Sequence, residues 1–236
     1  MRECCSGAGD VVVHVIETTA LLSRTPALTD CLAAEEQSRL NRYSNAAARD
    51  MFIAAHGGLR LLLARLLNVR AGAIRIATHE HGKPYLPEYP DLHFNISHSR
   101  SMALIAIAGC PVGVDIEYLR RPVDFEAVLR RFFSSDERSD WQNHATPTPA
   151  EAFFRGWTRK EAILKATGEG IAGLGHTVIS FKPDEPRALL ARMQDPAEAQ
   201  KWLFKDFCPA TDYQAAVALQ APALNLSIKA FSLHDC

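Results

Sequence analysis

The sequence predicts an α+β fold built from two similar lobes, and three observations support that prediction. Short β-rich runs alternate with longer segments of helical periodicity along the 236 residues. Apolar residues make up 47% of the chain, which suffices to bury a sizeable core. The two halves also resemble each other, because each begins with a strand ending in Ile-Glu, continues through helices and closes on strands. We therefore expect one lobe over residues 1–111 and a second over residues 112–236, with Asp115 and Glu117 at the junction.

The first half predicts a strand, two helices and then a run of strands. A β-rich stretch at residues 11–16 comes first, and Gly57-Gly58 inside the second helix predicts a close contact with a neighbouring segment. The last two strands flank Gly109-Cys110-Pro111, which suits a hairpin turn. The expected helices cover residues 32–43 and 46–67, and the expected strands cover residues 73–77, 92–96, 102–108 and 112–117.

The second half predicts two helices followed by strands. A helix is expected at residues 125–133, and a polar segment containing Pro147 and Pro149 separates it from a longer helix at residues 150–167. Gly168 is a good stop signal for that longer helix. The remainder predicts strands at residues 178–181, 189–193, 202–207, 213–219 and 226–231.

Charge and cysteine content exclude several classes of protein. The net charge is -1 and the charged residues are interspersed, so the sequence predicts neither a nucleic-acid partner nor a membrane surface. The six cysteines show no C-x-x-C spacing and no disulfide framework. Because the N-terminus lacks a secretory pattern and no apolar run reaches membrane-spanning length, we expect a cytoplasmic protein.

Two acidic residues share one face of the strand expected at residues 112–117. Valine and isoleucine alternate there with Gly113, Asp115 and Glu117, so both carboxylates leave the same face with Cα atoms roughly 6.5 to 7 Å apart. Two like charges on a half-buried strand repel, and a hard cation such as Mg²⁺ would relieve that repulsion. Taken alone, the hexapeptide fits a solvent-exposed acidic strand face better.

The helix at residues 150–167 carries a second pair of charges on one face. Phe154, Trp157, Glu161 and Lys165 recur at helical spacing. An ordinary i,i+4 ion pair worth about 0.3 to 0.5 kcal/mol is one interpretation of Glu161 and Lys165. Since both charges lie beside an aromatic stripe that should face the core, we favour a functional site.

Hydrogen-bonding groups follow the strand that contains Phe94. Ser97 and His98 point apart on an extended chain and so cannot form a catalytic dyad, but both could hold a phosphate. Lys83, between a glycine and a proline, suits phosphate as well. His79 and His81 lack a third ligand at a recognisable spacing, which argues against zinc. Together with the acids, these groups indicate displacement at a phosphate with a metal on the pyrophosphate.

The motifs, in this order and spacing, resemble those of the surfactin-type 4′-phosphopantetheinyl transferases, in the single-chain branch of that superfamily. The motifs that carry the resemblance are Gly82-Lys83-Pro84, Phe94-Asn95-Ile96-Ser97-His98-Ser99, Gly113-Val114-Asp115-Ile116-Glu117, Arg131-Phe132-Phe133 and Trp157-Thr158-Arg159-Lys160-Glu161-Ala162-Ile163-Leu164-Lys165. The resemblance implies two lobes related by a pseudo-twofold axis, each a small, mostly antiparallel sheet packed with helices. Coenzyme A would lie in the cleft between them, in a monomer that is itself a pseudo-dimer.

The resemblance also implies roles for individual residues. The magnesium ligands would be Asp115, Glu117 and Glu161, with Glu161 taking a proton directly or through water and Lys165 near the pyrophosphate. The coenzyme A phosphates would be held by Lys83, Ser97, His98, Arg39 and Arg42, the last two at the 3′-phosphate. Relatives often carry a further arginine where this chain has Met51, and Arg49 is the nearby basic residue.

The implied reaction moves phosphopantetheine from coenzyme A to a serine of an apo acyl- or peptidyl-carrier protein and releases 3′,5′-ADP. An acidic carrier helix would dock on the second lobe beside Arg120, Arg121, Arg130 and Arg131. Two alternatives stay open at this point. The chain could be a coenzyme A or carrier-binding module without turnover, or a Mg²⁺-dependent hydrolase of other pyrophosphates.

Overall fold

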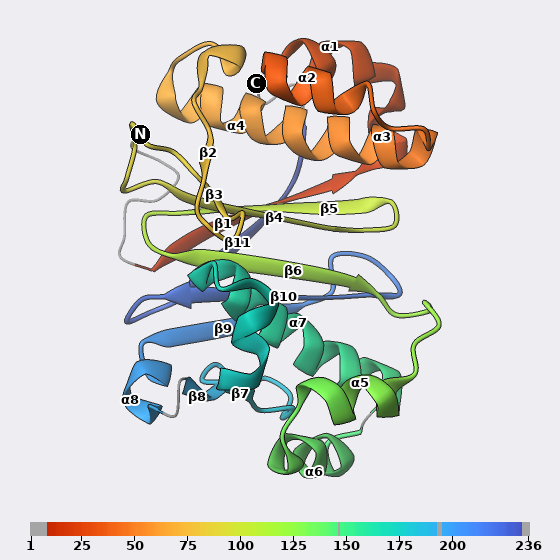
Figure 1. Ribbon diagram of the computed structural model, residues 1–236, viewed down its shortest axis with the longest axis vertical. Helices are drawn as coiled ribbons and strands as arrows, with labels where there is room; N and C mark the ends of the chain where they lie inside the picture. The colour runs from red at the N-terminus through yellow and green to blue at the C-terminus, as the bar shows by residue number, and fades with distance from the viewer. Residues whose placement is uncertain (1–8, 146, 193–194, 233–236) are drawn as a thin grey trace.

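Two β-sheets lie at the centre of the molecule with helices on their outer faces (Figure 1). This computed structural model describes residues 9–145, 147–192 and 195–232. The first sheet has the strand order β11-β1-β5-β4 and the second the order β6-β10-β9. The first sheet comprises β1 (Asp10–Glu17), β4 (His93–Ser99), β5 (Met102–Ala108) and β11 (Asn225–Ala230). The second comprises β6 (Val112–Tyr118), β9 (Trp202–Phe207) and β10 (Tyr213–Gln220).

A shared apolar core joins the two sheets. Leu104 and Ala106 of β5 pack in one cluster with Val114 of β6 and Val217 of β10, and all four side chains are buried. The valine and isoleucine positions of β6 face this core, as the alternation in the sequence predicts. The opposite face of β6, which carries Gly113, Asp115 and Glu117, is therefore turned toward the helix layer below it.

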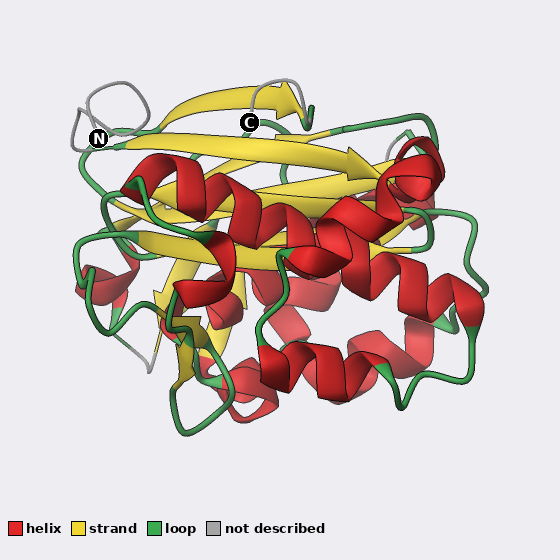
Figure 2. Cartoon of the chain, turned by 90° about the horizontal axis from the view of Figure 1, so that it is seen from above, coloured by secondary structure: helices red, strands yellow, loops and turns green. Residues whose placement is uncertain are grey.

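Helices α1 to α4 cover the outer face of the first sheet (Figures 1 and 2). They are α1 (Thr25–Asp30), α2 (Ala34–Leu40), α3 (Ala46–Phe52) and α4 (Gly58–Leu67), with a π-helical turn at Ile53–Gly57 joining α3 to α4. A Cβ on Gly57 would lie 2.6 Å from the carbonyl oxygen of Leu28, so the predicted close contact at this glycine pair is confirmed.

Helix α7 (Pro149–Thr167) packs directly on β6 of the second sheet (Figure 1). It begins where the Thr148 side chain accepts a hydrogen bond from the backbone of Glu151, and it ends at Gly168 in the left-handed conformation (φ 79°). A Cβ on Gly113 would collide with the backbone of α7 at Ala162 and Ala166. Gly113 thus allows the close approach that brings the helix face onto the acidic face of β6.

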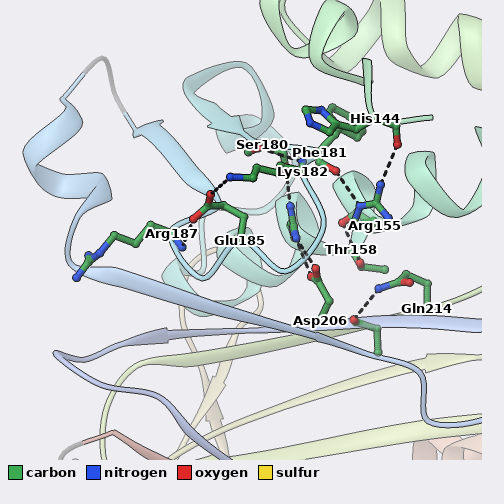
Figure 3. A network of polar contacts seen from close by, with 12 residues as sticks. His144, Arg155, Thr158, Ser180, Phe181, Lys182, Glu185, Arg187, Asp206 and Gln214 are labelled. Carbon is green, nitrogen blue, oxygen red and sulfur yellow. Dashed lines mark hydrogen bonds and ion pairs between the residues drawn. The ribbon is translucent and has the colours of Figure 1, made fainter. Parts of the chain in front are cut away.

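A polar network fixes the far side of α7 (Figure 3). Arg155 donates to the carbonyl oxygens of Phe181 and His144, at 2.8 and 3.0 Å. Arg159, which is fully buried, donates to the carbonyl of Ser180 at 2.6 Å and pairs with Asp206. These bonds connect α7 to β9 and to the segment after β7, so the helix cannot slide along β6.

The strands predicted at residues 102–108 and 112–117 do not form a hairpin. β5 pairs with β1 on one edge and with β4 on the other, so the chain crosses from the first sheet to the second at residues 109–111. The run Met102–Ala108 is apolar without alternation and is buried throughout, which is typical of a central strand covered on both faces.

Other predicted boundaries change as well. The strand expected at residues 73–77 is mostly irregular: residue 73 ends the helical turn Ala71–Ala73, residues 74–76 have no regular structure, and residue 77 begins the short β2 (Ala77–Thr78). Strand β2 pairs with β3 (Pro84–Tyr85). The remaining described elements are α5 (Phe125–Phe132), α6 (Ser135–Asn143), β7 (Thr177–Ile179), β8 (Leu189–Arg192), α8 (Pro196–Ala199) and two 3-10 helices, Thr18–Arg24 and Gly170–His176. Position 193 of the predicted β8 lies outside the described residues.

The last strand returns to the first sheet. β11 pairs in parallel with β1, so that sheet contains chain from both ends of the sequence. The lobe boundary at residue 111 and the pseudo-twofold relation remain predictions. Among the described helices, none is both long enough and apolar enough to cross a membrane.

Candidate active site

Side chains of β4 bridge the two sheets at the candidate site. Three alternate polar residues of β4 accept hydrogen bonds from backbone N–H groups of β6 at 2.9, 3.3 and 3.1 Å. The pairs are Asn95 with Val114, Ser97 with Ile116, and Ser99 with Tyr118. This side-chain ladder sets the register between the strands and brings Ser97 beside Asp115.

Asp115, Ser97 and Lys165 form a hydrogen-bonded triangle between β4, β6 and α7. Lys165 Nζ lies 2.6 Å from Asp115 Oδ1 and 2.8 Å from Ser97 Oγ, and Ser97 Oγ donates to Asp115 Oδ1 at 2.9 Å. Asp115 is 4% exposed. Its second oxygen, Oδ2, is buried and finds no hydrogen-bond partner among the described residues. A buried carboxylate oxygen left without a partner is costly unless something binds there.

Glu117 follows Asp115 on the same face of β6 and has its own donors. The indole N–H of Trp157 donates to Glu117 Oε1 at 3.1 Å, and Arg121 donates to the same oxygen at 3.0 Å. Ser99 makes only a long contact of 3.5 Å with Oε2. Burial, followed by the negative charge of Asp115, raises the pKa of Glu117 to about 7.

Glu161 is the third carboxylate of this region. It is partly buried on the face of α7 that also carries Trp157 and Lys165. Burial raises the pKa of Glu161, Asp115 raises it further, and Lys165 acts in the opposite direction. The ammonium of Lys165 bonds to Asp115 and Ser97, so it does more than form a surface pair within its own helix.

The carboxylates fit a hard cation that shares its ligands with a phosphate. In the described parts of the chain, no group of three or more acidic, histidine or cysteine side chains converges closely enough to enclose a metal alone. Mg²⁺ commonly takes only one or two carboxylates and completes its shell with water and substrate phosphate oxygens. The unpartnered Oδ2 of Asp115 and the neighbouring Glu117 and Glu161 supply oxygen donors of that kind.

Positive and donor groups lie on the first-sheet side. His98 lies on β4, and partial loss of hydration at its ring, followed by the positive charges of Lys165 and His56, lowers its pKa. Lys83 donates to the carbonyl oxygen of Ala166, so it reaches from the first half of the chain to the end of α7. Burial lowers the pKa of Lys83 to about 8.

A cavity of about 650 Å³ lies next to Lys83. Its walls include Tyr85, His93, Pro111 and Thr167, and it borders the end of α7 two residues beyond Lys165. The predicted 3′-phosphate residues lie elsewhere, on the helical layer. Arg39, Arg42 and Arg49 are all exposed there, and the guanidinium of Arg39 lies 5.2 Å from the centre of the Phe52 ring.

Two contacts of Glu117 were not expected from the sequence. The sequence pattern predicts Trp157 in the aromatic stripe of its helix and Arg121 on a docking surface, yet both donate to Glu117. The chemistry of the side chain could have indicated the Trp157 contact, because a partly buried tryptophan needs an acceptor for its indole N–H. Arg121 stands four residues after Glu117 where the chain leaves the strand, and its contact could not be derived from periodicity.

Taken together, the bridging β4 ladder and the carboxylate–lysine group at the contact of the two sheets offer charges suited to a cation and a phosphate group. Comparison with known proteins specifies the class. Residues 22–110 match the family model described as the N-terminal region of 4′-phosphopantetheinyl transferases, and residues 111–218 match that of the 4′-phosphopantetheinyl transferase superfamily.

Curated relatives agree with these matches. The chain is 36% identical over 196 residues to the 4′-phosphopantetheinyl transferase HetI of Nostoc sp., covering 81% of this chain and 80% of that protein. It is 36% identical over 114 residues to the 4′-phosphopantetheinyl transferase Sfp of Bacillus subtilis, covering 48% of this chain and 50% of that protein. The chain belongs to the 4′-phosphopantetheinyl transferase superfamily, in the single-chain, Sfp-type branch.

Proposed function

We propose that this protein transfers the 4′-phosphopantetheine arm of coenzyme A to a serine of an apo acyl- or peptidyl-carrier protein and releases 3′,5′-ADP. The observation that carries the proposal is the Asp115–Lys165 pair at the contact of β4, β6 and α7, in which the other oxygen of Asp115 has no partner among the residues that the structure describes. Two further carboxylates stand beside this pair, and family membership supports the same activity.

The metal in this proposal is Mg²⁺, held by Asp115, Glu117 and Glu161. When bound, it would neutralise negative charge on the pyrophosphate of coenzyme A. The protein's own part is to place these carboxylates in a partly buried region, where their interaction with a cation is stronger than in water. Catalysis of this kind rests on groups that are already oriented before the substrate arrives.

Glu161 is the proposed general base. Burial and the charge of Asp115 raise its pKa, which makes it a better proton acceptor than an exposed glutamate, directly or through a water. The carrier serine loses its proton to Glu161, and the serine oxygen forms a bond to the β-phosphorus. The bond from that phosphorus to the oxygen of 3′,5′-ADP breaks, and Lys165 stabilises the charge on the leaving group. The product is a phosphodiester on the carrier.

The groups proposed to hold coenzyme A are Lys83, Ser97, His98, Arg39 and Arg42. The positive charge of Lys165 acts on His98, after desolvation the largest cause of the lowered pKa of its imidazole, and positive charge there favours binding of a phosphate group. The cavity beside Lys83 is large enough for a substantial part of the substrate outside the pyrophosphate. We assign the chain to the cytoplasm as a monomer.

The carrier could come from fatty-acid, polyketide or nonribosomal-peptide synthesis.

The two alternative functions, a binding module without turnover and a pyrophosphate hydrolase, fit less well. A binding module would not need a carboxylate of raised pKa on the same helix face as Lys165. A pyrophosphate hydrolase would need no protein acceptor.

The proposal is tested by intact-mass spectrometry of several apo-carrier proteins incubated with the enzyme, Mg²⁺ and coenzyme A. We expect the mass of one phosphopantetheine to be added to at least one carrier, and expect no addition in excess chelator. A carrier whose acceptor serine is replaced by alanine serves as the control. The absence of any addition across carriers from all three pathways would contradict the proposal.

A further inference from the structure

Glu117, like Asp115, has one carboxylate oxygen that accepts hydrogen bonds from two side chains of the described residues. The indole N–H of Trp157 and the guanidinium of Arg121 both donate to Oε1, at 3.1 and 3.0 Å. Among the described residues, Oε2 has only the long contact of 3.5 Å with Ser99 Oγ. The acceptor capacity of Oε1 is thereby largely used, and Oε2 is left for a further ligand.

The indole that donates to Glu117 is itself held by aromatic packing. Its ring stacks on Phe153 with centroids 6.1 Å apart and an interplanar angle of 12°. Phe132 meets it edge-on at 5.9 Å and Phe133 is tilted at 6.3 Å. Rings in such a cluster have few alternative rotamers, so the direction of the Trp157 N–H is set by the core of the second half.

We propose that Trp157 is a positioning residue that fixes the Glu117 carboxylate so that Oε2, and not Oε1, is presented to Mg²⁺. The proposal rests on the function proposed above and adds a role for a residue that does not itself touch metal or substrate. Groups that orient a metal ligand from outside commonly change metal affinity by 10- to 100-fold when removed.

A purely structural role would have different consequences. If the bond only joined the end of β6 to α7, removing it would lower stability and leave metal affinity unchanged in the folded protein. The positioning role predicts the reverse, namely weaker metal binding in a protein of nearly unchanged stability. The rate at saturating metal should then recover, because a disordered Glu117 can still be brought into place by excess Mg²⁺.

The test compares Trp157→Phe with the parent and with Trp141→Phe. Phenylalanine keeps an aromatic ring in the cluster and lacks the N–H. Trp141 is a matched control because its indole N–H donates to the carbonyl oxygen of Pro149, at 3.3 Å, away from the carboxylates. Binding of Mn²⁺ to the protein with coenzyme A and without carrier is followed by electron paramagnetic resonance, so no turnover is needed.

For Trp157→Phe we expect the apparent Kd for Mn²⁺ to rise about tenfold, and the KM for Mg²⁺ to rise with it, with kcat at saturating Mg²⁺ within about twofold of the parent. Trp141→Phe should have the same Kd for Mn²⁺, KM for Mg²⁺ and kcat as the parent. An unchanged Kd for Mn²⁺ in folded Trp157→Phe would overturn the inference. If the parent transfers phosphopantetheine in that case, the proposed function stands and only the positioning role fails.

A second measurement does not depend on the folding of the tryptophan variant. The indole N–H signals of the ¹⁵N-labelled parent are compared with those of Glu117→Ala. Loss of its acceptor should move the Trp157 signal upfield and speed its exchange with water, with the Trp141 signal unchanged. A Trp157 signal that is the same in both proteins would show that the hydrogen bond does not exist in solution.

Discussion

Asp115 is a buried charged residue at the centre of the proposed chemistry. It is almost fully buried, it pairs with Lys165 and Ser97 through one oxygen, and within the described part of the chain its other oxygen has no partner. Replacing it with asparagine keeps the shape of the side chain and removes the charge. We expect Asp115→Asn to lower kcat by about a hundredfold or more, as loss of a preoriented electrostatic group does.

The rate of holo-carrier formation measures this effect, with thermal unfolding as a check that the variant is folded. Asp212→Asn is the control, because Asp212 pairs with the exposed Arg120 at 2.7 Å outside the site. Parent-like activity in folded Asp115→Asn would remove Asp115 from the mechanism.

Lys83 should make coenzyme A binding depend on pH. Because burial lowers its pKa to about 8, the ammonium is charged below pH 8 and becomes neutral above it. Its attraction for a phosphate is therefore present at pH 7 and lost as the pH rises through about 8. We expect the KM for coenzyme A to increase between pH 7 and pH 9 in the parent.

Lys83→Arg provides the comparison, since a guanidinium stays protonated over this range. The increase in KM should be much smaller in that variant. An identical pH dependence of KM in both proteins would assign the titration to another group.

The residue types of the site could be predicted from the sequence, but most of their contacts could not. The acids of β6 and the charges of α7 follow from strand and helix periods, which place Asp115 and Glu117 on one face and Glu161 and Lys165 on another. Periodicity says nothing of distances between segments that are 50 residues apart. The bond between Lys165 and Asp115 therefore appears only in the folded chain.

Strand β4 joins the two sheets through side chains where a neighbouring strand would use its backbone. Asn95 is buried, and its Oδ1 accepts the hydrogen bond of the Val114 N–H. Asn95→Ala leaves that buried N–H without a partner, which costs about 1 to 3 kcal/mol. We expect the free energy of unfolding, measured in urea, to fall by that amount.

The matched control is Asn225→Ala, because Asn225 donates to Asp10 at 3.0 Å on the surface. It should change the free energy of unfolding by less than about 0.5 kcal/mol. Equal effects of the two substitutions would mean that the β4 ladder adds nothing beyond an exposed hydrogen bond.

Helix α5 offers the exposed arginines expected to receive an acidic carrier. Arg121 is engaged with Glu117, so reversing its charge would disturb the site as well as the surface. Arg130 and Arg131 are exposed on α5 and give a cleaner test. We expect the double variant Arg130→Glu, Arg131→Glu to raise the KM for carrier severalfold and leave the KM for coenzyme A unchanged.

The matched control reverses Arg65 and Arg70, which are exposed in the first half of the chain. The parent's KM for carrier should also rise with salt, because steering by exposed charges is screened. A parent-like KM for carrier in the α5 variant at low salt would place the docking surface elsewhere.

Long elements with strong periodicity were predicted well, and short or bridging ones were not. Helix α7 and strands β1, β9 and β10 lie close to their predicted ranges. The error at residues 109–111 arose because local turn signals cannot reveal that both edges of β5 are already occupied by β1 and β4. The short α1 and α6 carry little amphipathic pattern of their own and depend on the tertiary contacts around them.

At the scale of the whole molecule, the site exists because groups from both sheets meet. Lys165 reaches from α7 to Ser97 of β4, and Lys83 reaches from the first half of the chain to Ala166 of α7. The sequence predicted two similar lobes from the likeness of its halves. It gave no sign that β11 returns to pair with β1, because parallel pairing of the two ends leaves no local pattern.

The most direct test of the account counts 3′,5′-ADP, by chromatography, against holo-carrier, by intact mass, in the same reaction. The account predicts one 3′,5′-ADP for each phosphopantetheine attached. It predicts none when the carrier is omitted or its acceptor serine is replaced by alanine. Release of 3′,5′-ADP without a carrier would contradict the account and indicate a hydrolase. Binding of coenzyme A without release of 3′,5′-ADP under any condition would contradict it and indicate a binding module.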